Sequence, residues 1–396
     1  MPYFVSDDII EKFRDKDLLD AFPKAEVVNN DLGSFLRIKD PFEGLEEKYR
    51  IKPDELSIFR RFTEQKLSLV NGINEKTSQI FRKKKLNHIS ELIGLGYTQF
   101  HNAETLNTSI SCSDYETMLE NSNVRTGDLL FCVEPEELLF LDIETTGQTS
   151  SELFLIGIGY FEKIENGSYE FNTELLFARE LVDEVSILKY FVDLLPRYRM
   201  FVTYNGRMFD IPFIRNRICT LLETEDIQET YAKFNEENSN DLFLVDDIID
   251  HIIDKFLHFD LYFEIRYTYK DLLPNYRLVT AEEHILDFYR DEYLPSGNIP
   301  MIYIDWVAEP EKYTGAIFKV IQHNYYDIIN LARLMKEWIS TNILMTYNKT
   351  IRNTDEPLEK VKTKLNDDEK NEIIVELEQY YSSLKRTNAK TLDDFL

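Results

Sequence analysis

The sequence predicts an α/β fold. Two apolar runs typical of buried strands lie in residues 138–160, which read LLFLDIETTGQTSSELFLIGIGY, and a shorter run lies in residues 201–204. A long amphipathic helix is predicted over residues 316–335, because apolar side chains recur there every three or four positions. At 396 residues, 43% of them hydrophobic, the chain is long enough for more than one domain and can bury a substantial core.

The first apolar run ends in two acids, Asp142 and Glu144. Side chains at i and i+2 of a strand leave the same face, so these carboxylates are expected to lie side by side at the end of a buried strand. Neighbouring carboxylates repel each other unless a cation lies between them, and hard divalent cations prefer oxygen ligands. The pattern therefore predicts a metal site at the edge of the core. The alternative is a hairpin whose polar tip holds two acids.

Residues 201–217, FVTYNGRMFDIPFIRNR, predict a short strand, a turn and the start of a helix. Asn205-Gly206 is a turn signal, and Pro212 is tolerated in a first helical turn. Asp210 suits the N-cap position of this helix. The residue is therefore either a helix cap or a further acidic ligand.

The helix predicted over residues 316–335 carries polar groups on its apolar stripe. Asp327 shares this stripe with Val320 and Leu331, and His323 lies on it too. Burying an unpaired charge is unfavourable, so Asp327 needs a partner. A metal ion would be such a partner.

The chain carries, in this order, Asp-x-Glu on a strand, Asn-x-x-x-Phe-Asp, and an Asp on a late helix. This order of motifs resembles the DEDD exonuclease superfamily. The chain is more similar to one branch, the YprB-like ribonuclease-H-like domain, over residues 138–338. The segments that carry the resemblance are LDIETTG (141–147), LIGIGY (155–160), YNGRMFDIPFIRNR (204–217), HFDL (258–261), NYRLVTAEEHIL (275–286) and IQHNYYDIINLARL (321–334). The resemblance implies a ribonuclease-H-like mixed sheet with helices on both faces, in a domain over residues 138–340.

The same resemblance implies a metal-dependent 3′→5′ exonuclease with a two-metal-ion mechanism. The expected ligands of two Mg²⁺ or Mn²⁺ ions are Asp142, Glu144, Asp210 and Asp327. The expected nucleic-acid contacts of this domain are Thr145, Asn205 and Phe209. In the superfamily a His or Tyr on the last helix orients or deprotonates the attacking water, and His323 would have this catalytic role here.

The spacing of His323 departs from the family pattern. His-type members carry the His five residues before the Asp, whereas Tyr-type members carry a Tyr four residues before it. His323 stands at the Tyr spacing before Asp327, and Gln322 occupies the usual His position. One residue on a helix is a rotation of about 100°, so His323 either reaches the water by a different geometry or only holds a phosphate. An ordinary histidine on a helix face is the alternative.

Residues 1–137 are predicted to form a mostly helical N-terminal region. Within it, residues 67–93 resemble a helix-hairpin-helix motif, which binds the nucleic-acid backbone through amide N–H groups. The contacts are expected at Gly72, Asn74 and Lys76. Asn74 replaces the usual second glycine, and Asn is one of the few other residues that visit the left-handed region. An ordinary helical hairpin with a basic surface is the alternative.

Residues 341–396 are predicted to form a charged tail with one helix over residues 367–386. The final residues 389–396, AKTLDDFL, resemble a sliding-clamp-binding peptide. The side chains that would enter the apolar pocket of the clamp are Leu392, Phe395 and Leu396. A frayed terminus with incidental apolar residues is the alternative.

Composition limits the cellular setting. The net charge of −27 argues against a large nonspecific nucleic-acid-binding surface. The three cysteines lack metal-ligand spacing and fit a reducing cytoplasm. Residues 1–137 contain no apolar stretch near the ~18 residues of a membrane span, so we expect a cytoplasmic protein with no membrane segment.

The leading hypothesis is a 3′→5′ exonuclease that acts on single-stranded DNA in replication or repair. The hairpin-like segment and the clamp-like tail favour DNA over RNA. No residue reports on a 2′-hydroxyl contact, so a 3′→5′ exoribonuclease is the close alternative. A non-catalytic DNA-binding or clamp accessory protein and a structure-selective endonuclease are the other hypotheses.

Overall fold

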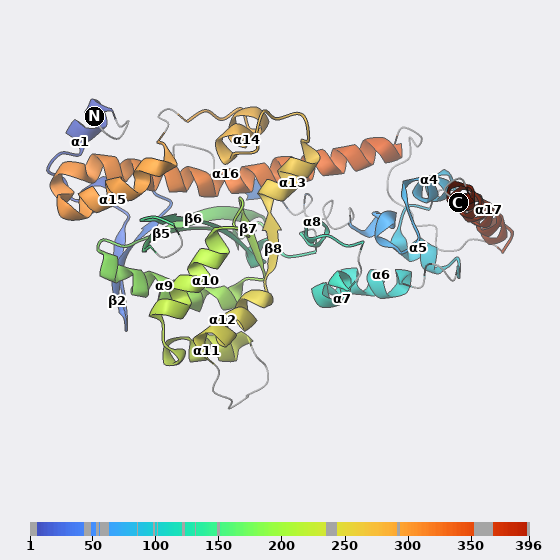
Figure 1. The fold of residues 1–396 in the computed structure, drawn as a ribbon, viewed down its shortest axis with the longest axis horizontal. Coiled ribbons are helices and arrows are strands. Elements are labelled where there is room, and N and C mark those ends of the chain that lie inside the picture. Colours follow the sequence, from blue (N-terminus) through green and yellow to red (C-terminus); the bar gives the residue numbers. More distant parts are fainter. Residues whose placement is uncertain are drawn as a thin grey trace. The chain divides into compact units, whose positions relative to one another are not determined.

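The computed structural model describes residues 6–42, 49–52, 55, 63–84, 86–97, 100, 102–120, 123–130, 132–148, 151–234, 244–290, 294–351 and 367–393. The chain divides into two compact units, and Figure 1 labels their elements. The first unit comprises Met1–Pro53 and Val133–Asn342, and the second comprises Asp54–Cys132 and Ile343–Leu396.

An eight-stranded mixed sheet forms the centre of the first unit. Its strands are β1 (Glu26–Asn30), β2 (Gly33–Lys39), β3 (Arg50–Ile51), β4 (Leu138–Thr145), β5 (Leu153–Lys163), β6 (Tyr169–Phe177), β7 (Met200–Thr203) and β8 (Leu257–Asp260). The order is β1-β2-β6-β5-β4-β7-β8, and β3 pairs with β6. The β4–β7 and β7–β8 pairs are parallel and the others are antiparallel.

Strands β1, β2 and β3 belong to this sheet, although the sequence predicts a mostly helical N-terminal region. Leu36 of β2 pairs with Phe177 of β6, and the side chains of Phe35, Leu36 and Ile38 are fully buried. Strand β2 is stabilised by this pairing with a segment more than a hundred residues away in the sequence. Local patterns do not report such a partner.

Helices cover both faces of the sheet. They are α1 (Asp7–Lys12), α2 (Leu18–Ala21), α9 (Glu184–Leu194), α10 (Asp210–Leu221), α11 (Thr224–Phe234), α12 (Val245–Asp254), α13 (Leu261–Thr268), α14 (Leu278–Ile285), α15 (Ile299–Ala308) and α16 (Pro310–Ile351). Helices α9 to α12 lie on one side of the sheet, and α15 and α16 lie on the other (Figure 1). The predicted α/β class, a mixed sheet flanked by helices, is confirmed.

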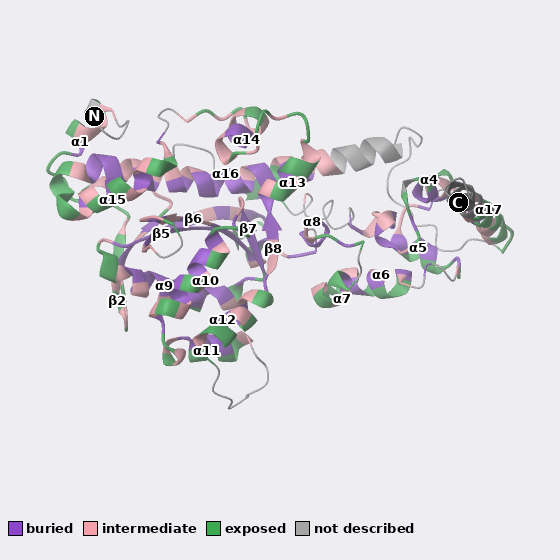
Figure 2. Cartoon of the chain, in the orientation of Figure 1, coloured by how far each residue is buried: buried purple, intermediate pink, exposed green. Residues whose placement is uncertain are grey.

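The core of the first unit lies between the sheet and these helices. On α16 the predicted stripe is buried at Val320 and Leu331, and Figure 2 shows the buried positions along this helix. The ring of Phe140 on β4 meets that of Phe171 edge to face, with centroids 4.9 Å apart. Burying one such side chain fully contributes about 1.5–3 kcal/mol. None of the described helices combines the length and the apolar character that a membrane span requires.

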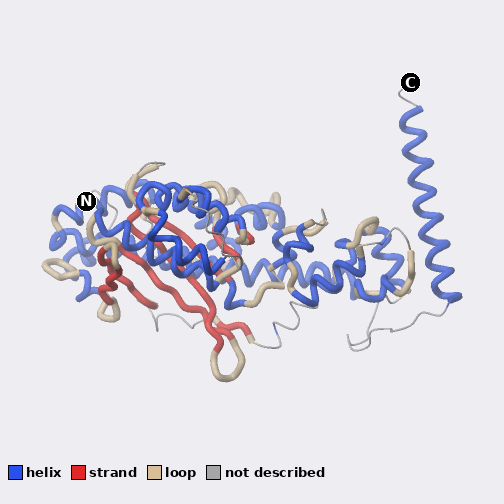
Figure 3. Tube along the Cα trace, turned by 90° about the horizontal axis from the view of Figure 1, so that it is seen from below, coloured by secondary structure: helices blue, strands red, loops and turns tan. Residues whose placement is uncertain are grey.

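The described part of the second unit consists of helices and turns (Figure 3). Its α-helices are α4 (Glu75–Lys83), α5 (Ile89–Ile93), α6 (Ala103–Cys112), α7 (Tyr115–Leu119), α8 (Thr126–Leu129) and α17 (Asp367–Asp393). Ile373 and Leu377 of α17 are buried. Nζ of Lys84, at the end of α4, lies 2.6 Å from Oε1 of Glu372 on α17. The predicted tail helix therefore packs against the end of α4 and belongs to the core of this unit.

The hairpin-like turn before α4 differs from its prediction in one respect. Gly72 takes a positive φ of 83°, as a tight turn requires. Asn74, however, has extended backbone and is the N-cap of α4, where its Oδ1 accepts the N–H groups of Lys76 and Thr77. The expectation that Asn74 replaces a left-handed glycine is wrong, because the residue caps the helix instead. The amide of Lys76 that was expected to face a phosphate donates to this cap.

Helix α17 also contacts this turn. The hydroxyl of Tyr381 donates to the carbonyl of Gly72, and Nδ2 of Asn74 donates to the hydroxyl of Tyr380 at 3.2 Å. The helix continues through Leu392 to Asp393. The last two residues of the clamp-like peptide, Phe395 and Leu396, lie outside the described residues.

Candidate active site

Asp142 and Glu144 lie on one face of β4, near its carboxyl end. The other residues of this strand are buried, whereas these two are partly exposed. Asp142 pairs across the sheet with Gly157 of β5, so no neighbouring side chain on β5 covers it. Both carboxylates therefore face α16, as the contacts of this helix with them show.

A turn after β7 brings Asp210 to β4. Asn205 takes a positive φ of 65°, which Asn tolerates, and its N–H donates to Oδ1 of Asp260 at 2.7 Å. Asp210 is buried, and its Oδ1 accepts the N–H of Ile143 at 3.2 Å. The alternative interpretation of Asp210 as a helix N-cap is wrong, because α10 begins at this residue and its carboxylate accepts a hydrogen bond from β4.

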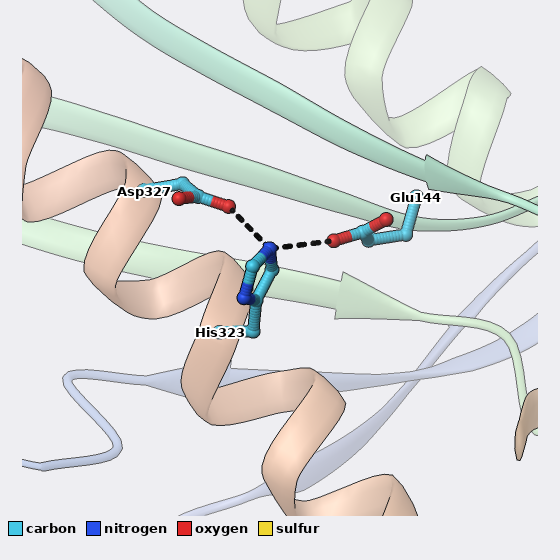
Figure 4. Close-up of side chains that lie close together, drawn as sticks. All are labelled: Glu144, His323 and Asp327. Atoms are coloured by element: carbon cyan, nitrogen blue, oxygen red, sulfur yellow. Dashed lines mark ion pairs between the residues drawn. The ribbon is translucent and has the colours of Figure 1, made fainter. Parts of the chain in front are cut away.

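One turn of α16 carries His323 and Asp327 (Figure 4). Nε2 of His323 lies 3.2 Å from Oδ2 of Asp327 and 3.9 Å from Oε1 of Glu144. The imidazole thus points at both carboxylates, with only 14% of its side-chain surface exposed. At its unusual spacing, His323 still faces the acids.

Three polar residues that the sequence analysis did not single out complete the cluster. Nδ2 of Asn324 donates to Oδ2 of Asp142 at 2.8 Å. Arg290 donates to Asp327 and to Glu282, and its Nη1 lies 2.9 Å from Nδ1 of His323. These contacts link the acids to α16 and to the chain between α14 and α15.

Helical spacing could have indicated Asn324 but not Arg290. Asn324 lies three positions before Asp327, so it shares the buried side of α16. Arg290 comes from an irregular segment, where no periodic pattern marks a buried position. Asp260 lies in the segment HFDL (258–261), but its bond to the turn after β7 depends on the pairing of β7 with β8.

Crowding changes the protonation of the cluster. Loss of hydration, and then repulsion by Asp327 and Asp210, raises the pKa values of Asp142 and Glu144 well above their ordinary range. Loss of hydration also raises the pKa of Asp210 to about 7. Burial lowers the pKa of the His323 imidazole, which is therefore neutral near pH 7.

The donor set fits a hard divalent cation. Glu144, His323 and Asp327 offer ligand atoms that all lie within 4.8 Å of one another. Carboxylate oxygens predominate in the cluster, and these are the ligands that Mg²⁺ and Mn²⁺ prefer. A bound cation would also offset the repulsion that raises the pKa values of the acids.

Comparison with known families assigns the domain that holds this cluster. The RNase H superfamily matches residues 139–339, a range that contains all five residues of the predicted catalytic set. The chain belongs to the RNase H superfamily. No curated protein matches it. Because nucleases with an RNase H-like domain generally use divalent metals, membership and the acidic cluster together indicate a metal-using, nucleic-acid-cleaving hydrolase.

The three nucleic-acid contacts predicted in the RNase H domain have different surroundings. The Thr145 side chain is buried, and its hydroxyl donates to the carbonyl of Gly147 at 2.7 Å. The amide of Asn205 is engaged by Asp260, as described above. Phe209 precedes α10 directly and keeps 39% of its surface exposed. Of these three residues, Phe209 offers an exposed ring for stacking.

Gly157→Ala tests the fit of α16 against the RNase H sheet. A Cβ on Gly157 would lie 2.1 Å from Oδ1 of Asn324 and 2.8 Å from Cγ1 of Ile328. We expect the variant to lose about 1–3 kcal/mol of stability, as overpacked cores do, and to lose nuclease activity because Asn324 is displaced from Asp142. Urea unfolding and a cleavage assay measure the two effects.

The matched control is Gly297→Ala, because no side chain or backbone from elsewhere in the described chain lies within 4 Å of the position that its Cβ would take. This variant should keep both stability and activity. Wild-type stability in Gly157→Ala would show that α16 does not approach β5 this closely.

Proposed function

We propose that the chain is a metal-dependent 3′→5′ exonuclease of the YprB-like DEDD branch. The observation that carries this proposal is the convergence of four carboxylates and one imidazole from three elements, β4, α10 and α16. They are Asp142, Glu144, Asp210, His323 and Asp327. Clustered acids are unfavourable without a cation, so this set supports metal binding.

The four carboxylates would hold two Mg²⁺ or Mn²⁺ ions. When bound, such ions activate a water and stabilise the leaving 3′ oxygen of a phosphodiester. The protein itself orients the ligands: Asn324 holds Oδ2 of Asp142, and the Ile143 N–H holds Oδ1 of Asp210. Both bonds would hold these carboxylates in place for a cation.

Two further residues would contact the substrate. His323 directs Nε2 toward the acids, where the scissile phosphate or the attacking water would lie. The exposed ring of Phe209, next to Asp210, can stack on a terminal base, an interaction worth about 1–3 kcal/mol per base in single-strand binders. Together they would position the 3′ end of a strand.

We propose single-stranded DNA as the substrate, with RNA as the close alternative. The resemblances of residues 67–93 and 389–396 support DNA and a sliding-clamp partner, and a cytoplasmic location is proposed with them. A nucleic acid at the hairpin-like turn would have to displace the contacts that Tyr380 and Tyr381 make there.

One observation favours a second candidate, a non-catalytic nucleic-acid-binding module. Arg290 already donates to Asp327, so a guanidinium supplies part of the positive charge that the acids need. A module that has given up metal chemistry could use such a contact as a permanent replacement for the ion.

Digestion of 5′-labelled single-stranded DNA and RNA tests the proposal. Each strand is incubated with Mn²⁺ or with EDTA, using wild type, Asp210→Asn and the control Asp250→Asn. Asp250 pairs with Arg215 on the surface, apart from the acidic cluster. We expect a ladder that shortens from the 3′ end, requires metal, disappears in Asp210→Asn and persists in the control.

Other products would contradict parts of the proposal. Long discrete fragments would identify an endonuclease, and a ladder on RNA alone would identify an exoribonuclease. Absence of cleavage with either polymer and any divalent metal would favour the non-catalytic module.

A further inference from the structure

Arg290 places a permanent positive charge inside the acidic cluster. It lies in the irregular segment that follows α14, and only 6% of its side-chain surface is exposed. Its Nη2 donates to Oδ1 of Asp327, and its Nη1 lies 2.9 Å from Nδ1 of His323. The guanidinium thus contacts a proposed metal ligand and the proposed catalytic imidazole at once.

A second carboxylate outside the metal cluster anchors this arginine. Glu282 on α14 is fully buried and accepts Nε at 2.9 Å and Nη2 at 2.6 Å, a bidentate pair. Nδ2 of Asn330 on α16 also donates to Glu282, at 2.9 Å. A bidentate pair fixes the plane of the guanidinium, so Arg290 is held where it is before any metal binds.

This geometry determines which nitrogen of His323 carries its proton. A guanidinium can only donate, so Nδ1 of His323 must accept from Arg290. Because Nδ1 accepts, the imidazole carries its proton on Nε2, which faces Oδ2 of Asp327 at 3.2 Å. In this tautomer Nε2 donates a hydrogen bond. Such a donor suits an oxygen of the scissile phosphate rather than removal of a proton from water.

Arg290 also affects cation binding at the same acids. Its charge attracts the carboxylates and repels a divalent ion that approaches them. We infer that Arg290 is a positioning residue with two effects: it sets His323 as a donor to the substrate phosphate, and it weakens metal binding at the carboxylate cluster. This inference rests on the proposed nuclease function.

The test compares Arg290→Met, Arg290→Lys and Arg217→Met in the full chain. Arg217 is a matched control, because it also forms a buried pair with a carboxylate, Glu184, apart from the cluster. Mn²⁺ binding is measured by calorimetry, and kcat and KM are measured on single-stranded DNA.

We expect Arg290→Met to bind Mn²⁺ at least about tenfold more tightly, because a like charge is removed, while kcat falls at least about tenfold. Arg290→Lys keeps the charge but not the planar fork, so its Mn²⁺ affinity should stay within about threefold of wild type without recovery of kcat. Arg217→Met should change neither quantity by more than about threefold. A merely structural role of Arg290 would weaken metal binding and activity together.

Carbon-13 NMR of the imidazole in metal-free wild type gives a readout that needs no variant. We expect the Nε2–H tautomer for His323, and the Nδ1–H tautomer would overturn the assignment. Unchanged or weaker Mn²⁺ binding in Arg290→Met would overturn the inference. A wild-type kcat in Arg290→Lys would also overturn it, and this second test holds even if Arg290→Met does not fold. Wild type that neither binds Mn²⁺ nor cleaves nucleic acid would contradict the proposed nuclease function itself.

Discussion

Asp142→Ala is expected to abolish cleavage and to leave the RNase H domain folded. The carboxylate would be a ligand of the proposed ions, and such ions supply several kcal/mol of transition-state stabilisation, so we expect a loss on the order of 10³-fold in kcat. In metal-free buffer above pH 7 the melting temperature should rise by about 2–4 °C, because a poorly hydrated carboxylate that Asp327 and Asp210 repel is removed.

Steady-state cleavage and thermal unfolding in EDTA measure these effects. Asp250→Ala is the control, because this acid is paired with Arg215 outside the cluster. Its melting temperature should not rise, since the substitution removes an attraction rather than a repulsion. An Asp142→Ala protein that unfolds would identify Asp142 as a structural residue and would defeat the metal-site proposal.

The metal-free protein is expected to lose stability as the pH rises from about 4 to above 7. The pKa of Asp210 is raised to about 7, and those of Asp142 and Glu144 are raised well above their ordinary range. In the unfolded chain these groups lose their protons near pH 4, so between the two pKa values the folded state binds more protons. Their contribution to stability is fully present below about pH 4 and is lost as the pH rises through the folded-state values.

A divalent metal should reverse this loss. Metal binds the deprotonated carboxylates, so added Mn²⁺ should raise the melting temperature more at pH 8 than at pH 5.5. Urea unfolding of wild type and Asp210→Asn across this range, in EDTA and in Mn²⁺, makes the comparison. The Asn variant cannot titrate and should show a weaker dependence on pH. Equal pH dependence of the two proteins would mean that Asp210 is not protonated in the folded state at neutral pH.

Local patterns predicted the elements of the RNase H domain that carry the acids. The Asp-x-Glu pattern placed Asp142 and Glu144 on one face of a strand, and helical spacing placed His323 and Asp327 on the buried side of α16. Such predictions succeed because strand and helix periodicities are properties of consecutive residues. The N-cap alternative for Asp210 failed, since its carboxylate accepts from the backbone of β4, which lies far away in the sequence.

In the second unit, too, local features could be predicted from the sequence and long-range contacts could not. The turn at Gly72 and the helix α4 that follows it could be predicted from the Asn-Gly turn signal. The sequence did not reveal that α17 would contact this turn, because Tyr380 and Tyr381 lie about three hundred residues away. Contacts of that kind depend on the packing of both segments.

By itself, then, the sequence determined the α/β class, the strand and helices of the cluster, and the acids proposed to bind metal, because each depends on short-range periodicity or on an ordered motif. Only the tertiary structure decided that Asn324 would hold Asp142, that β1 to β3 would extend the sheet, and that Arg290 would enter the cluster. These outcomes arise from side chains and strands that meet across long stretches of chain, where burial and charge pairing select the partner. No pattern of neighbouring residues records that selection.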